Sequence, residues 1–425
     1  MRPLHVAVLL LVGFAGPRIC VGDLLLKNAR LVDPAARRTI VTDLFIHDGK
    51  IADPGGVPAP PTPPEVLDLQ GRWVIPGLID LHVHYPGNAL PDGNDEEHDI
   101  RESARIFLRA GVTAFLDLGS SDTEIFTERD RQRAGAADTA DEADIYCAGV
   151  PFGRWSLPDA AAAATRLPAY IARWHPDVIK FIYDHARRRR ARLPADREIL
   201  LAGIAAARRA GVKTVVHIGN WEDARDILDA GATAITHFHD DEVIPDDLVR
   251  RWAASPILSI PTLAVQMDLV NFIDQPALLD QPLLRSIAAP ASLAAYRNRA
   301  HFVDRAIGGL QWRRDGSPHD RQTFAKLHAA GVTMLAGSDT NNLGVFLGYS
   351  LHRELLLMQQ SGFSPWEALA AGTTAAAAFL GRPAGIHPGE TAELVILDAD
   401  PAADVANTQR IHAVVHRGRY FLREQ

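Results

Sequence analysis

Cysteine is scarce in this sequence of 425 residues, which contains only Cys20 and Cys147. Two cysteines cannot form the framework of several disulfides that holds small secreted domains together. Positive charge is also in deficit, because 44 Lys and Arg residues face 52 Asp and Glu residues and leave a formal net charge of −8. A chain this acidic is a poor candidate for binding a phosphate backbone over its whole surface, so we expect no nucleic-acid partner. The contents of hydrophobic residues, 47%, and of charged residues, 23%, are ordinary for globular proteins and exclude wholesale disorder.

A hydrophobic run long enough to cross a membrane is also missing at the N-terminus. The apolar stretch at residues 6–15 is shorter than the roughly 20 residues that a transmembrane helix needs. It follows the positive charge of Arg2 and includes the small residues Gly13 and Ala15, which suit cleavage by signal peptidase. We therefore predict a signal peptide within residues 1–22, no stable membrane span, and a periplasmic or secreted protein. The alternative is a cytoplasmic protein that begins with an apolar strand.

Strand-like patterns at both ends of the chain flank a mixed middle. Short segments rich in apolar residues occur near the start, at residues 24–32, 43–46 and 66–69, and again near the end, at residues 392–397 and 411–418. Ends made only of strands, around a middle of strands and helices, predict one small β-domain to which both termini contribute.

The middle of the chain alternates apolar strands with alanine-rich helical segments. This alternation predicts an α/β fold in which eight parallel strands form a barrel. Residues 265–317, between the last two strands, are long for a connection, so we expect a lid or a contact between subunits of a homo-oligomer there. The eight expected strands are residues 78–84, 112–119, 144–149, 178–183, 214–219, 234–239, 257–263 and 332–339.

Several of the 17 histidines lie at the ends of these strands. His82 and His84 are two positions apart in one strand, so both imidazoles point to the same side and suit metal chelation. His217, His237 and Asp339 lie near the C-terminal ends of three other strands, where barrel enzymes carry their active sites. Each histidine taken alone is consistent with an ordinary core histidine. Four histidines and one aspartate at the same rim instead predict a metal centre.

Lys180 is an unusual member of the apolar strand at residues 178–183. A lysine in such a strand is normally a buried cation that pairs with a carboxylate. Beside metal ions, burial and like charge would both lower its pKa. The neutral amine would then be able to add carbon dioxide and become a carbamate, an anion that bridges two metals.

Two segments of the sequence resemble the motifs of a known family. Residues 76–84, Pro-Gly-Leu-Ile-Asp-Leu-His-Val-His, resemble the opening motif of the amidohydrolase superfamily of metal-dependent hydrolases. Residues 385–398 resemble its closing motif, with Glu393 where aspartate is commoner. The resemblance extends from about Asp23 to Arg423. It implies a distorted (β/α)8 TIM barrel over residues 76–385 and a β-sandwich formed by residues 23–75 and 386–425.

The resemblance also implies roles for the strand-end residues. Two divalent metal ions, for which zinc is the first choice, would share a hydroxide that attacks the substrate carbonyl. Manganese, cobalt or iron would suit the same ligand types. Asp339 would bind the first metal and act as the catalytic proton shuttle. The implied metal ligands are His82, His84 and Asp339 at the first ion, His217 and His237 at the second, and carboxylated Lys180 between them.

Departures from the superfamily pattern narrow the expected reaction. Asn220 stands three residues after His217, where mononuclear deaminases carry a glutamate, and residues 144–149 lack the metal-binding glutamate of aminosugar deacetylases. Lys180 and the segment leading to His237 look most like the prolidase and carboxypeptidase group, which borders the imidazolonepropionase-like enzymes. We therefore expect hydrolysis of a small-molecule amide that is peptide-like, a dipeptide or an N-acyl amino acid. A cyclic amide or lactone hydrolase is the alternative, and a metal-free scaffold protein is the third hypothesis.

Candidate substrate-binding residues lie beside the expected ligands. Arg188 belongs to the basic run at residues 187–192, and an arginine fork there would suit a substrate carboxylate. A solvated loop is the alternative for this run. Tyr85, Asn220 and His239 are close in sequence to the histidine ligands and are expected to contact substrate or to support a ligand.

Overall fold

The structure is a computed structural model, and it describes residues 19–20, 22–53, 63–85, 87–119, 124–185, 193–238 and 241–423. The expected signal peptide falls on residues 1–22, of which only 19–20 and 22 are described, so it stays a prediction. Among the described residues, no helix combines the length and the apolar run that crossing a bilayer requires.

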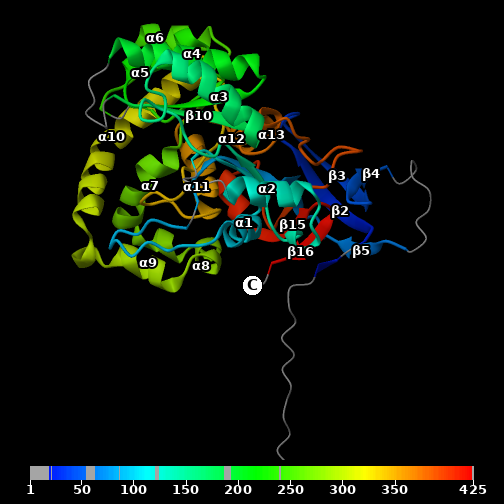
Figure 1. The fold of residues 1–425 in the computed structure, drawn as a ribbon. Helices are drawn as coiled ribbons and strands as arrows, with labels where there is room; N and C mark the ends of the chain where they lie inside the picture. Colours follow the sequence, from blue (N-terminus) through cyan, green and yellow to red (C-terminus); the bar gives the residue numbers. More distant parts are fainter. Residues whose placement is uncertain are drawn as a thin grey trace, which may run out of the picture.

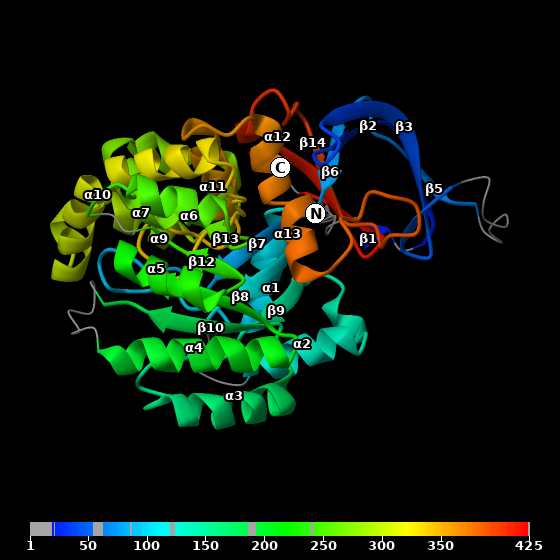
Figure 2. The same ribbon diagram turned by 90° about the horizontal axis from the view of Figure 1, so that it is seen from above.

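Parallel strands at the centre of the molecule confirm the predicted α/β class (Figure 2). Most of their residues are buried on both faces, which is typical of parallel strands covered by helices. Seven of the eight expected strands are present, with ends shifted by a few residues. One sheet contains β7 (Leu78–Val83), β8 (Val112–Asp117) and β9 (Asp144–Cys147), and the other contains β10 (Val178–Tyr183), β11 (Lys213–Ile218), β12 (Ala234–Thr236) and β13 (Leu258–Ile260).

The prediction of an eighth strand at residues 332–339 is wrong. This segment makes an isolated bridge between Met334 and Ser259 of β13, while one of its carbonyls accepts the N–H of Leu81 in β7. Its backbone bonds are thus divided between two neighbours. The chain then turns into the left-handed region at Asp339, with φ of 60°, so no regular ladder forms.

Backbone contacts also join β9 to β10. Phe152, which lies beyond the end of β9, forms a bridge with Phe181 of β10. Its N–H donates to the carbonyl of Lys180 at 2.8 Å, and its carbonyl accepts the N–H of Ile182 at 2.8 Å. A single apolar cluster draws side chains from both sheets and from the segment that bridges them, including Ile79, Leu116, Val178, Val215, Ala234, Ile260 and Leu335.

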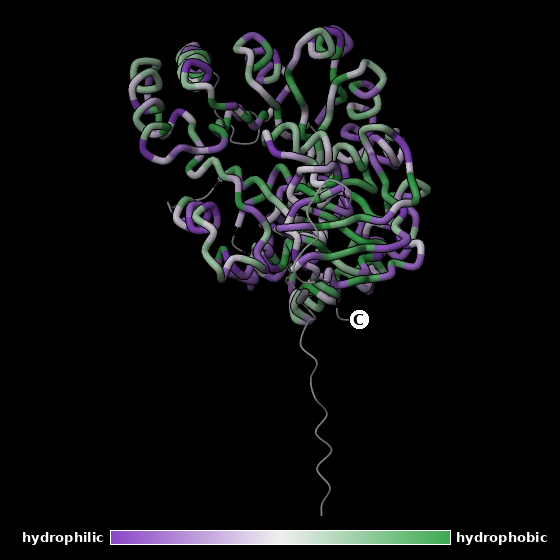
Figure 3. The backbone as a smooth tube through the Cα atoms, turned by 90° about the vertical axis from the view of Figure 1, so that its right-hand side faces the viewer, coloured by the Kyte–Doolittle hydropathy of each residue, from purple (hydrophilic) through white to green (hydrophobic). Residues whose placement is uncertain are grey.

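Helices surround the parallel strands (Figures 1 and 2). Hydrophilic stretches lie along these outer helices and the turns, whereas hydrophobic stretches cross the middle of the molecule (Figure 3). Side-chain caps fix several helix starts, as where Asp159 accepts the N–H of Ala162 and Ser364 accepts that of Glu367. Residues 265–317, predicted as a long connection, are mostly helical and include the first half of a long helix at residues 304–329. The helices are α1 (Ile100–Arg109), α2 (Glu124–Arg133), α3 (Ala160–Trp174), α4 (Pro194–Arg209), α5 (Trp221–Ala230), α6 (Asp246–Ala253), α7 (Leu263–Asp274), α8 (Pro282–Ile287), α9 (Pro290–Arg297), α10 (Asp304–Ala329), α11 (Tyr349–Gln360), α12 (Pro365–Ala371) and α13 (Thr374–Leu380).

Strands from both ends of the chain share a third sheet, which lies to one side of the parallel strands (Figure 1). The described strands run in the order β1-β16-β15-β14-β6-β2-β3-β4, with β5 beside β2. Pro76 at the end of β6 lies opposite Leu394 in β14, and the N–H of Gly77 donates to the carbonyl of Glu393 at 2.8 Å. The C-terminal strands therefore hold the residues that lead directly into β7. The strands are β1 (Ile19–Cys20), β2 (Leu24–Asp33), β3 (Arg38–His47), β4 (Lys50–Ala52), β5 (Glu65–Asp68), β6 (Trp73–Pro76), β14 (Leu394–Leu397), β15 (Ile411–His416) and β16 (Arg419–Leu422).

Candidate active site

The two histidines of the opening motif lie together at the C-terminal end of β7. His82 is fully buried, whereas His84, just beyond the strand, keeps 26% of its side chain exposed. Their ring centroids are 5.2 Å apart. The alternation of side chains along the strand thus places both imidazoles on the same side, as predicted.

Asp339 completes a group of three possible metal ligands with these histidines. Its Oδ1 lies 3.3 Å from Nε2 of His82 and 3.1 Å from Nε2 of His84. One ligand atom from each residue lies within 4.8 Å of the others. Two imidazoles and a carboxylate are a donor set that suits a divalent ion, and Nδ1 of His82 is buried without a hydrogen-bond partner among the described residues. These residues therefore fit a metal.

Asp80, which the sequence analysis did not select, holds this group together. Its buried carboxylate accepts hydrogen bonds from the N–H of His82 at 3.2 Å and from Ser338, at 2.9 Å from the backbone N–H and 2.5 Å from the hydroxyl. Burial raises the pKa of Asp80 to about 7 although these hydrogen bonds lower it. Gly337 permits the close approach, because a Cβ there would lie 2.8 Å from that of His82. Asp80 thus ties β7 to the segment that carries Asp339.

His217 and His237 lie beside the first group. Their ring centroids are 4.4 Å apart, and the rings of His82 and His237 are 4.8 Å apart. Nδ1 of His237 contacts Oγ1 of Thr262 at 2.7 Å, so this ring would coordinate a metal through Nε2. Nε2 of His217 lies 3.8 Å from a carboxylate oxygen of Asp184. All four predicted histidines therefore gather at one place.

Lys180 reaches the same place from β10 and is buried. Its Nζ lies 3.3 Å from Nε2 of His82 and donates to Oγ1 of Thr236 at 3.3 Å. In the described part of the chain, no carboxylate lies within 4.0 Å of Nζ, so the alternative of an ordinary buried ion pair is not what the structure contains. Burial lowers the pKa of Lys180 to about 7, against the opposing charges of Asp339 and Asp117.

The protonation states of His82, His84 and Asp339 depend on burial and on the charges around them. Burial and the charge of Lys180 lower the pKa of His82 well below its ordinary value, so this ring is neutral. Burial opposes the charged form of His84, but the hydrogen bond with Asp339 and the negative charges of Asp339 and Asp117 together outweigh it and raise the pKa of His84. Burial would raise the pKa of Asp339, yet the hydrogen bond from His84 and the neighbouring positive charges lower it. Asp339 is therefore an ionised acceptor at neutral pH.

The residues from β6 to β16 match a family model. The model of the amidohydrolase family covers residues 73–420. The chain belongs to the amidohydrolase family. Members of this family generally use divalent metals, in agreement with the group formed by His82, His84 and Asp339.

The similarity of this amidohydrolase to solved structures concerns its fold. It resembles a Bifidobacterium longum protein named as a prolidase, with a TM-score of 0.72, 23% identity and 94% of each chain covered. It also resembles molinate hydrolase, with a TM-score of 0.71, 20% identity and 94% of each chain covered. A dihydroorotase from Anaeromyxobacter dehalogenans (strain 2CP-C) is 32% identical over 121 residues, which are 28% of this chain and 27% of that relative. The chain thus matches about a quarter of the length of this curated relative.

Of the four residues predicted to bind substrate in the amidohydrolase, Tyr85 and Asn220 are among the described residues. Tyr85 is partly exposed, and its N–H donates to Asp117 at 3.4 Å. Asn220 caps α5, because its side chain accepts the N–H of Asp223 at 2.8 Å. This role explains Asn220 without a substrate. Arg188 and His239 lie outside the described residues.

Glu354 is hydrogen-bonded to the start of α7, which directly follows Thr262 in the chain. One oxygen of this buried side chain accepts the N–H of Ala264 at 2.7 Å, at the start of α7, and the other oxygen has no hydrogen-bond partner in the described chain. Burial raises the pKa of Glu354 from 4.5 to about 8, although the backbone hydrogen bonds lower it. The side chain is therefore protonated at neutral pH.

A pH-dependent stability follows from Glu354. The folded protein keeps a proton that the unfolded chain loses, so the free energy of unfolding should fall as the pH rises from about 4.5 to about 8, by on the order of 1 kcal/mol per pH unit, and level off above. Glu354→Gln should lack this contribution. Urea denaturation of both proteins from pH 5 to pH 9 measures the difference, and parallel profiles would contradict the prediction.

Proposed function

We propose that this amidohydrolase cleaves an amide bond of a small molecule with two divalent metal ions, for which zinc is our first choice. The observation that carries the proposal is the convergence of side chains from five separate segments, with Asp339 within 3.3 Å of His82 and His84 and Lys180 within 3.3 Å of His82. The proposed ligands are His82, His84, Asp339, Lys180, His217 and His237.

The proposal includes a domain organisation. The two parallel sheets and the segment between β13 and β7 would form one distorted (β/α)8 barrel over residues 76–385. Residues 23–75 and 386–425 would form the β-sandwich. We further propose export of the protein and its assembly into a homo-oligomer.

Different residues of the site would carry out different steps of the hydrolysis. Bound divalent ions lower the pKa of water and polarise a substrate carbonyl. Asp339, ionised and in contact with both histidines of β7, would accept the proton of the attacking water and deliver it to the leaving amine. The neutral amine of Lys180 would add carbon dioxide, forming an N–C bond and releasing one proton, so that a carbamate anion replaces it. The contact with Thr262 would hold the ring of His237 in one orientation.

Two substrate classes have support. The resemblance in fold to a protein named as a prolidase favours a peptide-like amide, a dipeptide or an N-acyl amino acid. The sequence similarity to a dihydroorotase favours the second candidate, a cyclic amide.

Removal and return of metal tests the function. We expect protein dialysed against a chelator to lose hydrolysis of a panel of dipeptides, N-acyl amino acids and cyclic amides, and to recover it with zinc, manganese or cobalt. Elemental analysis should find about two metal ions per chain in the active protein. A protein that binds no divalent metal and hydrolyses none of these amides would instead be a scaffold.

A further inference from the structure

A cavity of about 320 Å³ lies where α1, α8 and the last two strands, β15 and β16, come together. These elements lie near one another in the lower part of Figure 1. Cavities of roughly 300 to 1,000 Å³ have the size of binding sites for small organic molecules. None of the proposed metal ligands lines this cavity, so the proposed hydrolysis leaves it without a role.

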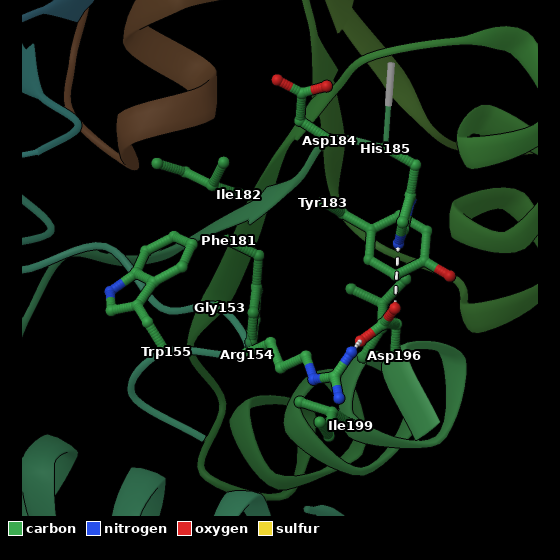
Figure 4. Close-up of a pocket in the computed structure, with 11 residues that line it drawn as sticks. Gly153, Arg154, Trp155, Phe181, Ile182, Tyr183, Asp184, His185, Asp196 and Ile199 are labelled. Atoms are coloured by element: carbon green, nitrogen blue, oxygen red, sulfur yellow. Dashed lines mark hydrogen bonds and ion pairs between the residues drawn. The ribbon is translucent and has the colours of Figure 1, made fainter. Parts of the chain in front are cut away.

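A second cavity, between β10 and α4, is much smaller at about 50 Å³ (Figure 4). Its polar groups already contact one another, because Asp196 lies 3.2 Å from Nε2 of His185 and 3.6 Å from the guanidinium of Arg154. A space of this size holds a few water molecules but no organic ligand. The larger cavity is therefore the candidate for a binding site.

Apolar side chains form much of the lining of the larger cavity. Val414 of β15 lies opposite Phe421 of β16, so both side chains face the same side of the terminal sheet. Leu108 of α1 and Ile287 of α8 extend this apolar surface. Leu422 also lines the cavity and is 37% exposed although it is large and apolar. The cavity thus suits the hydrocarbon part of an organic molecule better than an inorganic ion.

Arg423 adds a positive charge to this apolar surface. It follows Phe421 by two positions, and its N–H donates to the carbonyl of His412 at 3.2 Å, so its side chain faces the same side of the sheet. Its Nη2 donates to the hydroxyl of Ser286 at 2.6 Å and to the carbonyl of Pro282 at 3.4 Å. Both acceptors are uncharged, and among the described residues no carboxylate pairs with this guanidinium. Burial lowers the pKa of Arg423, which means that the cation has lost hydration without gaining a counter-charge.

Two arginines of α1 also line the cavity. Arg105 and Arg109 are four positions apart and therefore lie on the same side of the helix. Arg105 is already paired, because it donates to Asp141 at 3.1 Å and to Glu142 at 3.3 Å. Arg109 donates to Glu102 at 2.7 Å through Nη2 alone, and 51% of its side chain is exposed. Three arginines and the single aspartate, Asp141, give the lining a net positive charge that favours an anion.

The cavity lies away from the metal site. Arg109 is two residues before Gly111, whose carbonyl accepts the N–H of Leu78 at 3.1 Å, at the start of β7. His82 and His84 lie at the other end of the same strand. A molecule bound in the cavity would therefore not contact the proposed metal ligands.

We infer that this cavity is a second ligand-binding site, separate from the metal site, for a small organic carboxylate with a hydrocarbon chain. The planar fork of Arg423 binds the two carboxylate oxygens. The surface that includes Phe421 and Leu422 packs against the chain. The inference does not depend on the proposed hydrolysis.

Calorimetric titration of the metal-loaded protein with three probes tests both parts of the site. Octanoate carries the carboxylate and the chain, 1-octanol lacks the charge, and acetate lacks the chain. We expect octanoate to bind about tenfold more tightly, or better, than either of the others, because it alone uses both the guanidinium and the apolar surface. No binding of octanoate, or equal binding of octanoate and 1-octanol, would overturn the inference.

Substitutions locate the bound octanoate. Arg423→Gln keeps a donor for Ser286 but removes the charge, so it should weaken binding of octanoate by roughly tenfold to a hundredfold and leave binding of 1-octanol unchanged. Leu422→Asn should weaken binding of both compounds by roughly threefold to tenfold. Arg410→Gln, an exposed change just before β15, is the matched control and should bind like the unaltered protein. Undiminished binding of octanoate in both Arg423→Gln and Leu422→Asn would contradict the assignment.

The metal site also suits a carboxylate, and one further variant separates the two places. Lys180→Met removes a proposed metal ligand and should bind octanoate like the unaltered protein. Loss of octanoate binding in Lys180→Met, together with its retention in Arg423→Gln, would assign the carboxylate to the metal and overturn the inference. Because binding is measured without a substrate, the result is independent of whether the protein hydrolyses amides.

Discussion

Replacement of Asp339 by asparagine should lower kcat by roughly 10² to 10⁴-fold. The amide keeps the shape of the side chain but cannot accept a proton from the attacking water. It also removes the negative charge that lies 3.3 Å from His82 and 3.1 Å from His84, so occupancy of the first metal site should fall. Steady-state kinetics and elemental analysis on the same preparation measure both effects.

A matched control makes the Asp339 result specific. Asp315→Asn changes an exposed aspartate of α10, whose partner is the neighbouring Gln311, and should leave kcat and metal content as they are. Circular dichroism should show that both variants fold. Activity within a few-fold of the unaltered protein in Asp339→Asn would assign the proton transfer to another group.

Replacement of Lys180 by methionine should abolish turnover and leave the fold intact. An unbranched apolar side chain suits this buried position, whereas the bridging anion is lost. We expect about one metal ion or fewer per chain in place of two. Protein prepared in ¹³C-bicarbonate should show a carbamate resonance by NMR that the Lys180→Met variant lacks.

Lys213 offers the matched control for Lys180. It begins β11, at the strand end opposite the active site, and its ammonium lies over the ring of Phe379. Lys213→Met should retain turnover, two metal ions and the carbamate resonance. Full activity in Lys180→Met, or the same resonance in both variants, would remove the bridging role and point to a single-metal site.

The strands and the histidine cluster were largely predictable from the sequence for a simple physical reason. A parallel strand buried on both faces is a continuous apolar run, and a polar residue at its end is conspicuous, as with His217 after Val216. Residues 332–339 have the same composition, but their backbone bonds are divided between β13 and β7, which no local pattern reveals.

The supporting residues of the site were harder to predict. Thr262 contacts His237 from another segment, and Glu354 acts through the start of α7, so each depends on a long-range contact. Asp80 carried a local signal, because an aspartate within an apolar strand must find donors when buried. The charge density of the basic run predicted Arg188 as a ligand for a carboxylate, and this residue lies outside the described part of the chain.

The pairing of β6 with β14 has a consequence for biosynthesis. The motif containing His82 is made early, but the strand that leads into it has only β2 as a partner until residues 394–397 of β14 have left the ribosome. A nascent chain released before that point would carry every proposed metal ligand and still lack one of the two strands that pair with β6. Premature termination within the closing motif should therefore yield protein that binds metal poorly and is degraded.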